Sequence, residues 1–115
     1  MSDAEWLTVP DFADALGVTA SYVRDLLRDG ALVAERRGER NTVQIPAGFL
    51  TEGEHGVTIL TTLQGTLTML SDAGLDDSES IEWLLAHNDE LGTSPLGALR
   101  EGKRAPVRRA AQTLF

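Results

Sequence analysis

Cysteine is absent from the 115 residues of this chain, and aromatic residues make up only 5% of them. Without cysteine the chain cannot form a disulfide framework, a thiolate zinc site or a cysteine nucleophile, which suits a reducing compartment. No apolar run approaches the roughly 20 residues that a membrane-spanning helix needs. The acidic first residues also lack the basic and then apolar layout of a signal peptide. We therefore expect a cytoplasmic protein that does not bind a membrane.

Residues suited to catalysis or metal binding are also scarce. The only histidines are His55 and His87, and the acidic run after His87 offers no second ligand at helical i+4 spacing. The acidic residues 76–79 lack the ligand spacing of a calcium loop. The chain contains no phosphate-binding glycine loop and no nucleophile elbow. We expect no enzymatic activity, no metal site and no cofactor.

The charged residues are unevenly distributed along the chain. The net charge of −8 by itself disfavours nucleic acid as a partner. Residues 51–97 hold nine acidic residues and no basic one, whereas all ten basic residues lie within residues 18–50 and 98–115. Nine of the ten are arginines, and arginine suits bidentate contacts with phosphate and guanine. The acidic middle would then face away from any polyanion.

Hydrophobic residues make up 42% of the chain, enough for one domain to bury a core. The first half predicts two short helices, each running from a threonine N-cap to a glycine: Thr8 to Gly17 and Thr19 to Gly30. They meet through a Gly-Val-Thr corner, as in a helix-turn-helix. The β-prone runs at residues 32–37 and 42–45 flank a polar turn with a glycine, which predicts a β-hairpin.

The second half begins with a glycine-punctuated link at about residues 51–56. Residues 57–61 are strand-like by propensity but would equally extend the helix behind them. Short helices are predicted by apolar spacing and cap residues at residues 62–73, from Asp77 or Ser78 onward, from Ser94 to Gly102 and from Ala105 to the end. The predicted fold is mainly α with a small β-hairpin. A winged helix-turn-helix, residues 1–50, is followed by a compact C-terminal bundle of short helices, residues 51–115, and the two pack as one compact body.

Residues 18–46 contain a collinear series of short motifs. Val18-Thr19-Ala20-Ser21-Tyr22-Val23-Arg24 is followed by Leu26-Leu27-Arg28-Asp29-Gly30, then by Arg36-Arg37-Gly38 and Ile45-Pro46. This order resembles the helix-turn-helix of the excisionase and MerR-like winged-helix family. The whole chain is further similar to a small actinobacterial group of winged-helix DNA-binding proteins related to a mycobacterial kinase substrate. The resemblance implies a transcriptional regulator or nucleoid-associated factor.

Physical reasoning independently supports duplex DNA as the partner. A helix at about 19–29 fits the major groove, and a wing at about 32–45 would reach phosphates or the adjacent minor groove. The candidate DNA-binding residues are Thr19, Ser21, Tyr22, Arg24, Arg28, Arg36, Arg37, Arg40 and Asn41. Four or five arginines that each neutralise a phosphate would give a log–log salt slope of roughly −4.

Each candidate also has an explanation that needs no ligand. Arg24 and Arg28 are flanked by acidic residues, so both would form solvated ion pairs along the helix. Tyr22 is expected to pack at the core or its boundary rather than to contact a base. The wing pair Arg36-Arg37 would serve equally to protect a sheet edge.

A second basic surface is formed by Lys103, Arg104, Arg108 and Arg109. The segment around it resembles the C-terminal segment of Xre/MbcA/ParS-type antitoxin domains, which implies contact with a protein partner. Contact with the DNA backbone and a merely solvated surface are the other interpretations. The alternative function is therefore a protein-interaction module, antitoxin-like or an adaptor, that uses this basic helix or the acidic middle. No sustained heptad is visible, so we expect a monomer or a weak homodimer.

Overall fold

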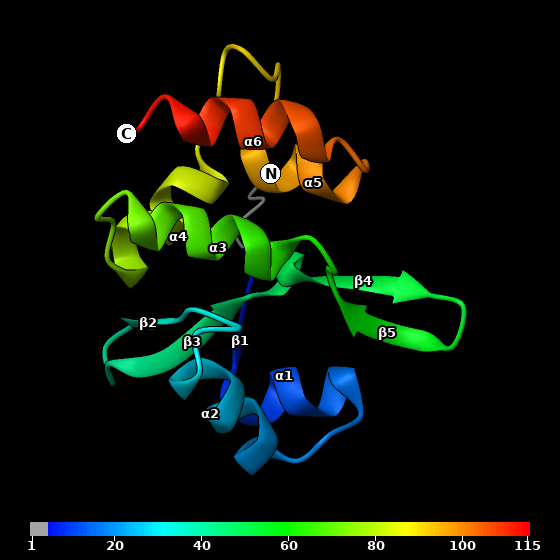
Figure 1. Ribbon diagram of the computed structural model, residues 1–115. Coiled ribbons are helices and arrows are strands. Elements are labelled where there is room, and N and C mark those ends of the chain that lie inside the picture. Colours follow the sequence, from blue (N-terminus) through cyan, green and yellow to red (C-terminus); the bar gives the residue numbers. More distant parts are fainter. Residues whose placement is uncertain (1–4) are drawn as a thin grey trace.

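The computed structural model describes residues 5–115, so Met1 to Ala4 lie outside the described part (Figure 1). The helix-turn-helix is formed by α1 (Val9–Leu16) and α2 (Ala20–Arg28). Its predicted caps are confirmed, because Thr8 and Thr19 accept hydrogen bonds from the backbone N–H groups of Asp11 and Tyr22. The two helices pack through fully buried side chains, Phe12 on α1 and Val23 on α2. The predicted helices are therefore present.

The predicted hairpin is formed by β2 (Glu35–Arg37) and β3 (Thr42–Pro46), which pair antiparallel. Asn41 in the turn has a φ of 55°, a conformation that asparagine tolerates better than most residues. A strand that the sequence did not predict, β1 (Trp6–Thr8), pairs with the other edge of β3 and completes a three-stranded sheet. The wing is thereby tied to the residues that enter α1.

A second hairpin replaces the link that we predicted at residues 51–56. The short 3₁₀ helix η1 (Ala47–Phe49) leads into β4 (Leu50–Gly53), which pairs with β5 (Gly56–Ile59). The prediction of a link was wrong because the hydrogen bonds of this hairpin depend on pairing between the two strands, which the composition of either run does not show. The pairing also resolves residues 57–59 as strand.

The C-terminal region contains α3 (Leu63–Asp72), α4 (Asp77–Leu85), α5 (Pro95–Arg100) and α6 (Arg104–Gln112). The N-cap of α4 is Asp76, not Asp77 or Ser78 as predicted. Asp76 accepts from the N–H of Glu79, and the Glu79 carboxylate accepts in return from the N–H of Asp76. This reciprocal capping box satisfies two backbone donors at once. Asp76 is therefore favoured as the N-cap, because Glu79 lies three residues after it.

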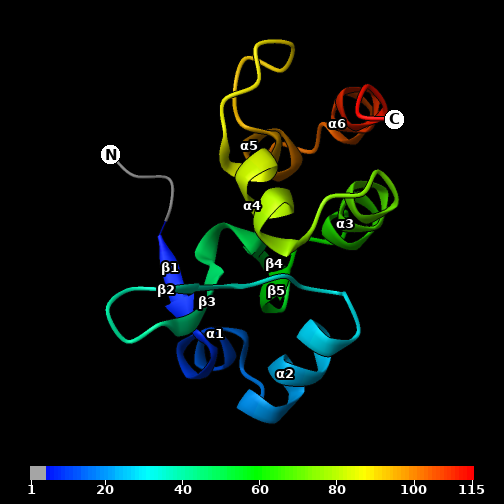
Figure 2. The same cartoon turned by 90° about the vertical axis from the view of Figure 1, so that its left-hand side faces the viewer.

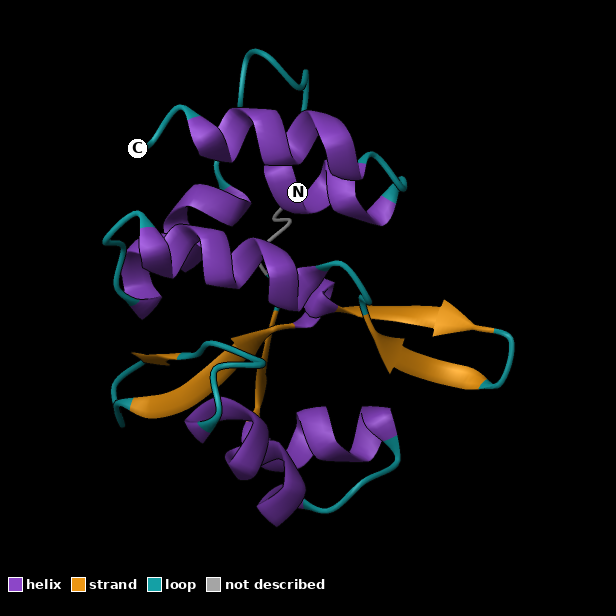
Figure 3. Cartoon of the chain, in the orientation of Figure 1, coloured by secondary structure: helices purple, strands orange, loops and turns teal. Residues whose placement is uncertain are grey.

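The strands lie between two groups of helices, with α1 and α2 on one side and α3 to α6 on the other (Figures 2 and 3). One hydrophobic cluster extends through both halves, from Phe12 and Val23 through Ile45 and Phe49 to Leu84 and Val107. The predicted fold class, a mainly helical winged helix-turn-helix with a C-terminal set of short helices, is confirmed. Among the described residues no helix is both long and apolar enough to cross a membrane.

Candidate nucleic-acid interface

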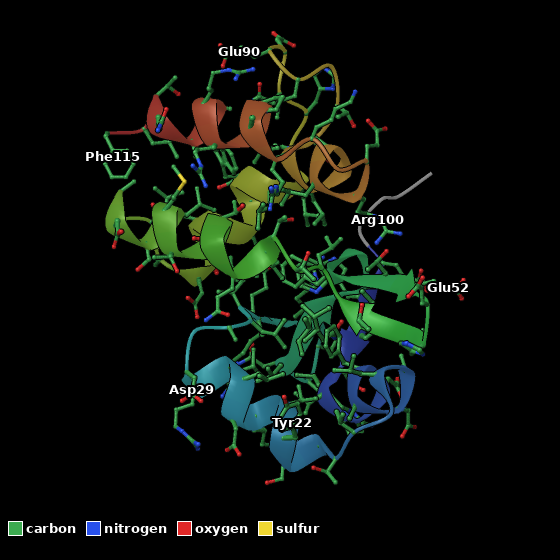
Figure 4. The ribbon with its side chains drawn as sticks, turned by 45° about the vertical axis from the view of Figure 1, so that its right-hand side comes forward. Tyr22, Asp29, Glu52, Glu90, Arg100 and Phe115 are labelled. Atoms are coloured by element: carbon green, nitrogen blue, oxygen red, sulfur yellow. The ribbon has the colours of Figure 1, made fainter. Side chains whose placement is uncertain are left out.

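The exposed face of α2 contains the first group of predicted contact residues. Ser21, Tyr22 and Arg24 are exposed, whereas Val23 between them is fully buried. Tyr22 is 50% exposed, so the expectation that it packs at the core or its boundary was wrong. Figure 4 shows Tyr22 on the outer side of α2 and Asp29 at the end of the same helix. The helix thus presents hydroxyl, phenol and guanidinium groups to solvent along its first two turns.

Arg24 lies where α2 meets the wing. It lines a groove of about 360 Å³ together with Leu27 of α2, Thr42 and Val43 of β3 and the start of α1. Among residues 5–115 no carboxylate lies within ion-pair distance of its guanidinium. The expectation that Arg24 forms an ion pair on its helix is therefore not met, and its charge remains available.

Arg28 differs from Arg24 although it lies one turn further along the same helix. Its Nη2 is 2.7 Å from Oδ1 of Asp25, and its Nε is 4.0 Å from Oδ1 of Asp29. The side chain is 71% exposed, so this is a solvated pair of the kind that contributes a few tenths of a kcal/mol. The local ion-pair interpretation is confirmed for Arg28, which can contact a phosphate only after it exchanges these carboxylates.

The two adjacent arginines of the wing point to opposite faces of the sheet, because successive strand residues alternate. Arg36 is paired across the sheet with Val43, so it shares the face on which Val43 and Arg24 line the groove. Arg37 lies on the other face, beside Trp6 and α4. The structure therefore does not bring both members of the Arg36-Arg37 pair to the face of α2.

Arg37 is held in place by two contacts. Its guanidinium carbon is 4.1 Å from the centre of the Trp6 ring, and its Nη1 is 2.9 Å from Oε2 of Glu35. Arg36 donates a hydrogen bond to the carbonyl oxygen of Asn41 at 3.2 Å, and Arg40 is exposed in the turn. Sequence reasoning missed the contact with Trp6 because β1 was not predicted. The signal for this strand was the β-prone run Trp6-Leu7-Thr8-Val9 before Pro10.

Arg37→Ala is expected to lower the free energy of unfolding by about 0.5–1 kcal/mol, because both its cation–π contact and its ion pair are lost. Urea denaturation followed by circular dichroism measures the change. Arg36→Ala is the matched control on the opposite face of the same strand, and a change below about 0.5 kcal/mol is expected for it. Equal losses in the two variants would contradict the role assigned to Trp6.

The C-terminal basic residues lie elsewhere. Figure 1 places α6 and α2 at opposite ends of the molecule, so the basic side chains of α6 do not extend the face of α2. Nζ of Lys103 is 3.1 Å from Oε1 of Glu101. Arg104 and Arg108 line a groove against α3, and Arg109 lies beside Glu90 and Leu91 in another. The four residues predicted to form one basic surface therefore lie in different surroundings: Arg104 and Arg108 share one groove, Arg109 lines another, and Lys103 is paired with Glu101.

Comparisons with known proteins match both halves of the chain. The sequence family described as "DNA-binding protein Rv2175c, wHTH domain" matches residues 1–50, and "Rv2175c C-terminal domain of unknown function" matches residues 60–114. DNA-binding protein Rv2175c of Mycobacterium tuberculosis (strain ATCC 25618 / H37Rv) is 36% identical over 102 residues, which cover 89% of this chain and 63% of that protein. The NMR structure of Rv2175c superimposes with a TM-score of 0.80 at 33% identity, covering 98% of this chain and 83% of that one.

Proposed function

The chain belongs to the family of the mycobacterial DNA-binding protein Rv2175c, and from this premise we infer that it binds double-stranded DNA through α2 and the wing. The helix α2 enters the major groove, which is about 12 Å wide and admits one α-helix. The wing follows the adjacent backbone or minor groove. The protein acts as a non-enzymatic regulator of transcription or a nucleoid-associated factor in the cytoplasm.

One observation carries this proposal. Arg24 of α2 and Arg36 of β2 lie on the same side of the sheet, and neither has a carboxylate partner among residues 5–115. Two uncompensated guanidinium groups that project from a helix and a wing onto a common face provide the donors that guanine and phosphate require. Arg40 in the exposed turn adds a third cation at the tip of the wing.

The polar side chains at the start of α2 complete the interface. The hydroxyl oxygen of Thr19 accepts from the N–H of Tyr22, which leaves its O–H free to donate to a phosphate oxygen. Ser21 and Tyr22 are exposed two and three residues further on, where the first turns of a recognition helix meet base edges. Tyr22 contributes an aromatic surface for the methyl group of a thymine or for a sugar.

The salt dependence of duplex binding tests the proposal. Arg28 and Arg37 are engaged with carboxylates, which leaves Arg24, Arg36 and Arg40. With Arg24 on a base, the other two arginines neutralise phosphates, and the expected log–log slope is about −2. This value is smaller than the slope of roughly −4 that follows when four or five arginines are counted. Fluorescence anisotropy of a labelled duplex over a series of salt concentrations measures it. An affinity that does not change with salt would refute the proposed interface.

A further inference from the structure

A groove of about 370 Å³ lies between α3 and α6, at the end of the molecule remote from α2 (Figure 1). Arg104 and Arg108 line it from α6, and Gly65 and Met69 line it from α3. The buried side chain of Leu99 contributes to its floor. The groove therefore combines an apolar part with two guanidinium groups, and neither the fold nor the proposed interface with DNA uses it.

The two arginines of the groove are uncompensated. Arg28, Arg37 and Lys103 each lie within ion-pair distance of a carboxylate, but within residues 5–115 no carboxylate lies that close to Arg104 or Arg108. Arg24 and Arg36 at the proposed interface with DNA are likewise without a carboxylate partner in this part of the chain. Like charges at i and i+4 on a helix also repel each other, so the pair does not stabilise the free protein. An anionic ligand between the two groups would remove this repulsion.

Gly65 is a second and independent observation. A glycine inside a helix is less favourable than an alanine, because the glycine backbone loses more conformational freedom. Gly97, the glycine within α5, has a packing reason, because a Cβ there would lie 2.7 Å from Oγ1 of Thr93. At Gly65 a Cβ would meet nothing within 4 Å. Packing within the described chain therefore does not require a glycine at this position, whose missing side chain keeps the wall of the groove open.

We propose that the α3–α6 groove binds an acidic segment of a partner protein, with two carboxylates on Arg104 and Arg108 and an apolar side chain between α3 and α6. The two arginines are four residues apart on α6, about 6 Å along the helix axis, which matches carboxylates at i and i+4 of a helical segment. Each guanidinium can bind a carboxylate through two parallel hydrogen bonds.

An acidic peptide suits this groove better than a second stretch of duplex DNA. Residues 51–97, which include α3 and α4, contain nine acidic residues and no basic one, so an extended polyanion that ran past the groove would be repelled by these carboxylates. A short segment avoids those carboxylates. Because α6 and α2 lie at opposite ends of the molecule, the groove stays accessible while α2 is engaged, and the protein can connect its DNA site to a partner.

The test uses the ¹⁵N-labelled full chain and a synthetic helical peptide that carries glutamates at i and i+4 and one leucine between them. Titration should shift the amide resonances of residues 61–69 and 104–108 and leave those of α2 unchanged. The double variant Arg104→Gln with Arg108→Gln should bind about tenfold more weakly. Lys103→Gln with Arg109→Gln, two cations on and beside the same helix, is the matched control and should bind within about twofold of the native chain.

Gly65→Leu adds a test that does not alter charge. Leucine favours the helix more than glycine does, so this variant should be at least as stable as the native chain while its filled groove binds the peptide more weakly. The proposal is overturned if no resonances shift up to about 1 mM peptide, or if both double variants lose affinity equally. Shifts at the same residues caused by duplex DNA, or by raising the protein concentration without peptide, would assign the groove to DNA or to a second copy and also overturn it.

Discussion

Arg24→Ala is expected to weaken binding to a specific duplex by about tenfold to a hundredfold, because a good arginine–guanine contact supplies about 1–3 kcal/mol of discrimination. Arg24 has no ion pair within residues 5–115 that binding to DNA would have to break. The substitution therefore removes the whole free energy of its contact with DNA. Anisotropy titrations at one fixed salt concentration measure the change. Arg24→Lys should keep most of the affinity for a random duplex and lose the preference for the specific one, because lysine cannot form a bidentate contact.

The matched control for this prediction is Arg28→Ala. Arg28 lies one turn further along the same exposed face, but it is 2.7 Å from a carboxylate oxygen of Asp25. Binding DNA would first have to break that contact, so the loss of affinity should stay below about threefold. If Arg28→Ala weakened binding as much as Arg24→Ala, α2 would contact DNA through general attraction to its charge, and the distinction between the two arginines would be wrong.

Phe49→Ala is expected to destabilise the whole protein by about 3–5 kcal/mol, a large part of the stability of a typical domain. The Phe49 side chain is fully buried. Its flanking residues connect the two halves, because Arg100 of α5 donates to the carbonyl oxygens of Gly48 and Leu50. The cavity left by the phenyl ring would therefore lie at the junction of the winged helix and the C-terminal helices. Urea denaturation followed by circular dichroism measures the loss.

The two tryptophans show whether the halves unfold together, which we propose. Trp6 lies on β1 and Trp83 on α4, so Trp83→Phe leaves a reporter in the first half and Trp6→Phe leaves one in the second. In the native background and with Phe49→Ala, the two fluorescence transitions should coincide, as for one cooperative unit. A transition of Trp83 that stays in place while that of Trp6 shifts would show two independent domains.

The local elements of this protein could be predicted from its sequence because their signals act over four residues or fewer. Thr8, Thr19 and Ser94 each cap a helix by accepting from an N–H three residues later. Gly17 ends α1 with a φ of 79°, a conformation that glycine adopts without strain. The order of two capped helices and a basic hairpin was sufficient to predict the winged helix and the family resemblance.

The pairings between distant residues could not be predicted in the same way. A β-prone run does not show which strand it will join, so the pairing of Trp6 with Pro46 and of Leu50 with Ile59 could not be predicted. The gain from such pairs depends on the partner strand and on burial. The missed strand β1 concealed the contact between Trp6 and Arg37, and the missed β4–β5 hairpin was interpreted as a link.

The sequence by itself therefore determined the helices, the wing and the number of arginines of this protein, since caps, turns and composition are local properties. Only the tertiary structure decided which arginines remain available. Strand register places Arg36 on the side of Arg24 and turns Arg37 toward Trp6, and packing places α6 and α2 at opposite ends of the molecule (Figure 1). The reason is physical: a side chain's face and its partners follow from the sheet and the core, which form between residues far apart in the chain.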